Sequence, residues 1–166
     1  YLASIYAMTC GLTIVSQKRR VTQAARLDIR ILRTLLELNL GRGFFDHSHF
    51  RLAHPVETDA SKSSRYAGGG YFSRDGRYRS WRYGASAARR PIDFLEGDAV
   101  VLALKDMGHT WRHARVPIFI DNQAFQLSAK KGWSRAPRLT AVLKRICELC
   151  IHFECVLEFH WISTQA

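Results

Sequence analysis

Two stretches of the chain place apolar residues at helical spacing. Over residues 93–108, an apolar stripe follows an i, i+4, i+7, i+11 pattern through Val100, Ala103 and Met107, which predicts an amphipathic helix. Residues 137–152 predict a second, longer helix. Its stripe comprises Leu139, Val142, Leu143, Ile146, Leu149, Cys150 and Phe153. Both helices need a large apolar partner surface.

Shorter segments predict five strands. The stretch "HPVETDAS" (54–61) reads as a strand running into a turn, and residues 66–84 read as two strands joined by the hairpin signal "RDGR". The stretch "VPIFIDN" (116–122) is apolar on both faces, as in a central parallel strand, and "VLEFHWIS" (156–163) predicts the last strand. A short helix before Gly132 completes an α/β order, which predicts a mixed five-stranded sheet flanked by helices.

Residues 1–48 differ from the rest of the chain. They contain an apolar N-terminal segment, the basic cluster "QKRR" at 17–20 and a predicted helix that ends at "GRG" (41–43). We therefore expect a mainly helical appendage over 1–48 and the α/β domain over 49–166.

The stripe of the first α/β helix begins with a carboxylate, Glu96. A charged Glu is rarely buried unless it is paired or bound to a metal. Either the stripe turns to solvent at its start, or a group at that end requires negative charge.

Two further acids stand at comparable places. Asp59 lies near the end of the first strand of the sheet, and Asp121 follows the fourth strand. If these strands are neighbours, both carboxylates meet below Glu96, and three crowded carboxylates cannot all stay charged without a cation. Hard oxygen ligands suit Mg²⁺ or Mn²⁺, and two such ions about 4 Å apart can drive phosphodiester hydrolysis. Singly, each acid could instead be a turn former, a helix cap or a dipole partner.

The charge balance points to a polyanionic partner. Twenty-five Lys and Arg residues against fourteen Asp and Glu residues give a net charge of +11. A solvated basic surface is the alternative. The candidate nucleic-acid contacts are Ser61, Lys62, Arg79, Trp81, Arg82, Asn122, Lys130, Lys131, Trp133, Arg135 and Arg138.

The cysteines predict no zinc site. Cys147 and Cys150 fall on the apolar face of the long helix, without a second ligand pair at zinc spacing, so we expect core thiols in a reducing intracellular compartment. The apolar start of the chain is shorter than a membrane span of roughly 20 residues, so no membrane partner is expected.

The motifs "ETDAS…GGGYF", "FLEGDAVVLAL", "IFIDNQA", "KKGWSR" and "FHWIST" resemble the ribonuclease H domain of reverse transcriptases, especially those of DIRS/Ngaro-like retrotransposons. The resemblance covers residues 50–166, and residues 1–48 look like the end of the polymerase thumb and the connection segment. It implies cleavage of the RNA strand of RNA–DNA hybrids with two Mg²⁺ or Mn²⁺ ions, beside the polymerase domain of the same polyprotein. Asp59, Glu96 and Asp121 match three of the family's metal-binding acids.

The sequence departs from this family in one place. The family carries a fourth acid shortly after the last strand, and this sequence has no Asp after Asp121. We therefore expect the domain to be truncated before its fourth ligand, which keeps a catalytically inactive nucleic-acid-binding or connection module as the alternative. A transposase or integrase core normally places its Glu last, whereas Glu96 precedes Asp121.

Overall fold

The computed structural model describes residues 20–38 and 49–163. The chain divides into two compact units, Tyr1–Gly43 and Phe44–Ala166. In the first unit, helix α2 (Gln23–Leu38) confirms the predicted helix, and the Thr22 hydroxyl accepts the N–H of Ala25 at 3.1 Å as an N-cap. The predicted helix end at 41–43 lies outside the described residues, and a polymerase origin of residues 1–48 stays a prediction.

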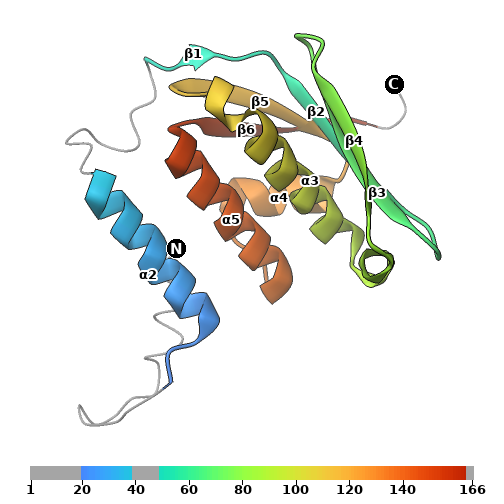
Figure 1. The fold of residues 1–166 in the computed structure, drawn as a ribbon, viewed down its shortest axis with the longest axis horizontal. Helices are drawn as coiled ribbons and strands as arrows, with labels where there is room; N and C mark the ends of the chain where they lie inside the picture. Colours follow the sequence, from blue (N-terminus) through green and yellow to red (C-terminus); the bar gives the residue numbers. More distant parts are fainter. Residues whose placement is uncertain (1–19, 39–48, 164–166) are drawn as a thin grey trace. The chain divides into compact units, whose positions relative to one another are not determined.

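The second unit is built on a mixed sheet (Figure 1). The strands β2 (Val56–Lys62), β3 (Ala67–Ser73) and β4 (Tyr78–Tyr83) form an antiparallel meander. The strand β5 (Ala114–Ile120) runs parallel to β2 and to β6 (Val156–Trp161). The prediction that the first and fourth predicted strands, here β2 and β5, are neighbours in the sheet is therefore confirmed.

A two-residue strand, β1 (Arg51–Leu52), also pairs with β5. It pairs with Ala114 and Arg115, whereas β2 pairs further along β5, with Ile118 and Phe119. Because β1 and β2 lie along successive parts of one partner strand, they are two parts of one strand interrupted near Pro55. The strand predicted over 54–61 corresponds to β2, and β1 was not predicted. The predicted mixed five-stranded architecture is confirmed with this interruption.

Three helices accompany the sheet. They are α3 (Ile92–Met107), α4 (Gln123–Lys131) and α5 (Pro137–Phe153), with short 3-10 turns at Ala85–Arg89 and Gly108–Thr110. Figure 1 shows these helices gathered along one side of the sheet. The helix α4 ends where predicted, because Gly132 adopts the left-handed conformation with a φ of 72°.

The core lies between this side of the sheet and the helices. Most of its members come from β5, α3 and α5, and they include Val116, Ile118, Leu104, Met107 and Leu143, all at most 4% exposed. Each fully buried aliphatic side chain contributes about 1.5–3 kcal/mol. This packing fixes the position of α3 over β2 and β3, and with it the position of Glu96.

The residue after Glu96 brings α3 close to the other two helices. A Cβ atom at Gly97 would lie 2.7 Å from Cγ1 of Val142 in α5 and 2.9 Å from a ring carbon of Phe125 in α4. We expect Gly97→Ala to lower the free energy of unfolding by about 1–3 kcal/mol despite the better helix propensity of Ala, because overpacking outweighs it.

Urea unfolding of the purified variant measures this effect. Gly84→Ala is the matched control, since a Cβ there meets nothing within 4 Å and the backbone φ of −62° is ordinary. We expect the control to stay within about 0.5 kcal/mol of the parent. Equal stability of both variants would contradict the close approach of the three helices at Gly97.

Candidate functional site

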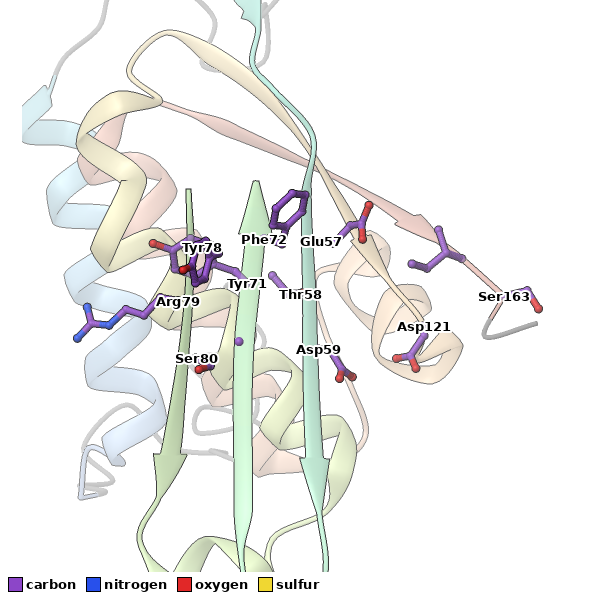
Figure 2. A pocket seen from close by; sticks show the side chains of 12 residues that line it. Glu57, Thr58, Asp59, Tyr71, Phe72, Tyr78, Arg79, Ser80, Asp121 and Ser163 are labelled. Carbon is purple, nitrogen blue, oxygen red and sulfur yellow. The ribbon is translucent and has the colours of Figure 1, made fainter. Parts of the chain in front are cut away.

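Three carboxylates converge at one end of the β2–β5 pair. Asp59 projects from β2, Asp121 directly follows β5, and Glu96 comes from the first half of α3. One oxygen atom of each side chain lies within 4.8 Å of the others. Figure 2 shows Asp59 on β2 and Asp121 at the end of the neighbouring strand β5. The parallel pairing of β2 with β5 causes this meeting, because it brings both strands to the same end of the sheet.

Glu96 is the buried member of the cluster. Its side chain is 2% exposed, and its Oε2 atom has no hydrogen-bond partner among the described residues. Burial, together with the charges of Asp59 and Asp121, raises the pKa of Glu96 to about 8. Burial and the neighbouring Asp121 also raise the pKa of Asp59. The inward carboxylate therefore faces other acids, and no basic side chain of the described residues contributes to its pKa shift.

This arrangement fits a hard divalent cation. Three carboxylates with an unpartnered, buried oxygen match the donors that Mg²⁺ and Mn²⁺ prefer. A cation at this place would offset both the burial of these carboxylates and their mutual repulsion, which together raise the pKa values of Glu96 and Asp59. Asp59, Glu96 and Asp121 are thus the residues that could hold such ions.

An open groove of about 800 Å³ lies on the sheet face beside the acids. Asp59 and Asp121 line it together with Glu57, Phe72, Tyr78 and Ser163 (Figure 2). Sequence reasoning did not single out Glu57, although it lies two residues before Asp59 and strand periodicity places both on one face. A linear substrate in this groove would reach Asp59 and Asp121 directly, with Glu96 behind them.

The residues predicted beside the acids make contacts of their own. Ser61 is exposed near the end of β2, and Lys62 donates from its Nζ to the carbonyl oxygen of Arg90 at 2.8 Å. The Asn122 side chain caps α4, since its Oδ1 accepts the Phe125 N–H at 2.9 Å. The amide NH₂ of Asn122 is not used in that bond. Their roles in nucleic-acid binding stay predictions.

The hairpin residues divide between the two faces of the sheet. Arg79 forms an ion pair of 2.7 Å with Asp106 of α3, and Trp81 packs against the core on the same side. Arg82 instead lies with its guanidinium 5.9 Å from the ring centre of Tyr66. Arg79 nevertheless lines the groove that Asp59 and Asp121 also line, whereas Trp81 is turned to the core. A role of either residue in nucleic-acid binding stays a prediction.

The remaining predicted contacts form an exposed basic segment, which we call the α4–α5 basic segment. All of its members are exposed, and Trp133 is 54% exposed, so this tryptophan is not part of the core. Its members are Lys130, Lys131, Trp133, Arg135 and Arg138. Exposed cations beside an aromatic ring suit a phosphate backbone.

Within the described residues, no fourth carboxylate joins the cluster. The Glu residues that follow Asp121 pair with arginines elsewhere: Glu148 with Arg145, Glu154 with Arg112, and Glu158 with Arg115. None of them serves as a replacement for the fourth acid of the resembled family.

Two further expectations concern the cysteines and the membrane. Cys147, Cys150 and Cys155 form no disulfide within the described part of the chain. Among the helices in that same part, none combines the length and the apolar character that crossing a bilayer would require.

Comparisons with known proteins agree with this architecture. No family model and no curated protein matches the sequence. The chain is similar to the solved structure of RNase H1 from the halophilic archaeon Halobacterium salinarum, with 18% identity and a TM-score of 0.55 over 67% of this chain and 86% of that one. It is similar to the N-terminal RNase H domain of a Mycobacterium tuberculosis protein, with 15% identity and a TM-score of 0.54 over 68% and 84%.

A third solved structure, LC11-RNase H1 in complex with an RNA/DNA hybrid, matches with 17% identity and a TM-score of 0.58 over 68% of this chain and 87% of that one. At these identities the likeness concerns the fold. The mixed sheet of the second unit, with its accompanying helices, is thus a ribonuclease H fold.

Proposed function

We propose that this chain is a ribonuclease H-type endonuclease that cleaves the RNA strand of RNA–DNA hybrids by two-metal-ion hydrolysis. The convergence of Asp59, Glu96 and Asp121 within 4.8 Å carries the proposal. Fold alone does not imply an activity, whereas a cluster of acids with an unpartnered buried oxygen offers the oxygen ligands that a divalent cation prefers.

The three acids would have distinct tasks. Bound divalent ions would activate the attacking water and stabilise the leaving oxygen of a phosphodiester. Asp59 and Asp121 line the groove and would hold the ions on the substrate side. Glu96 is buried behind them and would hold them from the protein side, where no water competes.

The surface charge supports a nucleic-acid substrate. The net charge of +11 and the exposed α4–α5 basic segment suit a phosphate backbone. A hybrid would be read by its shape and its 2′-hydroxyl groups, for which Ser61 and Asn122 beside the acids are the candidate contacts. One similar fold was solved with an RNA/DNA hybrid bound.

We also propose a reverse transcriptase of a DIRS/Ngaro-like retroelement as the wider context. This part rests on the sequence motifs, from "ETDAS" to "FHWIST". In that context the partner is the polymerase domain of the same polyprotein, in a reducing intracellular compartment. Mg²⁺ or Mn²⁺ is the expected cofactor.

Cleavage of an end-labelled RNA tests the proposal. We expect the protein to cut the RNA when it is paired with DNA in the presence of Mg²⁺ or Mn²⁺. We expect no cutting of an RNA–RNA duplex or a DNA duplex, and none in excess chelator, because the acids alone supply no nucleophile. Binding of the hybrid at low salt without cleavage, with either metal, would favour an inactive hybrid-binding module instead.

A further inference from the structure

The backbone carbonyl of Asp121 lies between two hydrogen-bonding ladders. The last register pair of β5 and β6 joins Ile120 to Trp161, so the sheet ends one residue before Asp121. The N–H of Phe125, which an earlier helix start would direct to the Asp121 carbonyl, instead bonds the Asn122 side chain at 2.9 Å. Neither the sheet nor the helix therefore satisfies this carbonyl.

A side chain from β6 satisfies it. The indole Nε1–H of Trp161 donates to the carbonyl oxygen of Asp121 at 3.0 Å. Trp161 is 48% exposed, whereas Trp111 is buried at 2%. Packing into the core therefore does not by itself explain why a tryptophan stands at position 161. The specific feature of Trp161 is this bond to the backbone of a candidate metal ligand.

Neighbouring bonds hold the chain on both sides of Asp121. The N–H of Ile162 donates to the carbonyl of Ile120 at 3.0 Å, and the buried Gln126 donates from its side chain to the carbonyl of Phe159 at 3.2 Å. The end of β5 and the start of α4 are thus both tied to β6. Between these ties, the Trp161 bond fixes the peptide plane that follows Asp121, and this plane sets the backbone ψ angle of Asp121.

We propose that Trp161 is a positioning residue for the candidate metal site. By holding the Asp121 carbonyl, its indole N–H orients the Asp121 carboxylate toward Asp59 and Glu96. The inference rests on the proposed metal site and extends it to a residue outside the acidic cluster.

Mn²⁺ binding to the purified protein tests this role without any substrate. Electron paramagnetic resonance of free Mn²⁺ gives the dissociation constant. We expect Trp161→Phe to weaken Mn²⁺ binding about three- to tenfold, the range of one lost hydrogen bond, while the melting temperature of the metal-free protein shifts by only a few degrees. Tyr66→Phe is the control, because Tyr66 is similarly exposed at 54% and its replacement also removes one polar group from an aromatic ring, and it should leave Mn²⁺ affinity unchanged.

A second replacement separates the N–H from the ring. Benzothienylalanine at position 161 keeps the shape of the indole and replaces its N–H group with sulfur. We expect it to weaken Mn²⁺ binding as much as Trp161→Phe does. Parent-like affinity with benzothienylalanine would overturn the positioning role, even if Trp161→Phe lost affinity through poor packing.

Asp121→Asn distinguishes failure of the inference from failure of the metal site. If Asp121→Asn weakens Mn²⁺ binding and both Trp161 replacements do not, the positioning role is wrong and the metal site stands. If Asp121→Asn binds Mn²⁺ as tightly as the parent, the metal site is wrong, and the role of Trp161 is overturned with it.

Discussion

Asp121→Asn is expected to reduce the rate of cleavage of the RNA strand in an RNA–DNA hybrid on the order of a thousandfold or more. The reason is that losing one member of a group of residues that act as a catalytic unit costs nearly as much activity as losing the whole group. A neutral amide is a weaker ligand for a hard cation than a carboxylate of nearly the same shape. The measurement is the initial rate of cleavage in saturating Mg²⁺ and again in Mn²⁺.

The loss should not come from unfolding. Burial and, after it, the neighbouring charge of Asp121 raise the pKa of Asp59, so removing that charge relieves the metal-free protein. We therefore expect a melting temperature equal to or above that of the parent. Asp75→Asn is the matched control, because this carboxylate pairs with Arg77 at the hairpin turn and is not a member of the acidic cluster. A parent-like cleavage rate for Asp121→Asn would contradict a catalytic role for the cluster.

The sequence predicted the sheet and the meeting of the acids because both depend on strong local patterns. Alternation along β2, the apolar run of β5 and the helical stripe of α3 specify their elements with little help from tertiary contacts. Once β2 and β5 are parallel neighbours, Asp59 and Asp121 must approach each other. The inward position of Glu96 then follows from its place on the stripe of Val100 and Met107.

The directions of long basic side chains could not be predicted in the same way. Arg79 and Arg82 both belong to β4, but Arg79 pairs with Asp106 of α3 and Arg82 lies over the ring of Tyr66. A pattern of period two assigns them to opposite faces without saying which face packs on a helix. That choice depends on where α3 lies against the hairpin.

The hydrogen bond between Trp161 and Asp121 could not be predicted from the sequence either. It joins residues 40 positions apart and involves a backbone carbonyl, which carries no residue identity in the sequence. The short strand β1 also escaped prediction, because only the pairing of β1 and β2 with β5 reveals that they belong to one strand. Contacts set by tertiary register leave no local signal.

Glu96→Gln is expected to stabilise the metal-free protein at high pH while it removes cleavage. The pKa of Glu96 is about 8 in the folded protein, against an ordinary value of 4.5. Between these two values the folded state holds a proton that the unfolded state has released, so the free energy of unfolding falls as the pH rises through this window. Gln imitates the protonated form at every pH.

Thermal unfolding in chelator at several pH values measures this effect. Near pH 5 the variant and the parent should be equally stable, and near pH 9 the variant should be more stable by on the order of 2–4 kcal/mol. A stability difference that does not change between these pH values would show that Glu96 does not titrate in this window.

The proton on Glu96 should also affect metal binding. Coordination requires the charged carboxylate, so Mn²⁺ binding below pH 8 releases the proton of Glu96. The Mn²⁺ affinity of the parent is therefore expected to rise up to about tenfold per pH unit toward pH 8 and to level off above it. In Glu96→Gln the affinity should be lower throughout and should lose most of this dependence, because the titrating ligand is gone. An equally steep dependence in the variant would assign the released proton to Asp59 rather than to Glu96. In that case, deprotonation of Asp59 would control the entry of the metal from the groove, and Glu96 would stay protonated and neutral behind it.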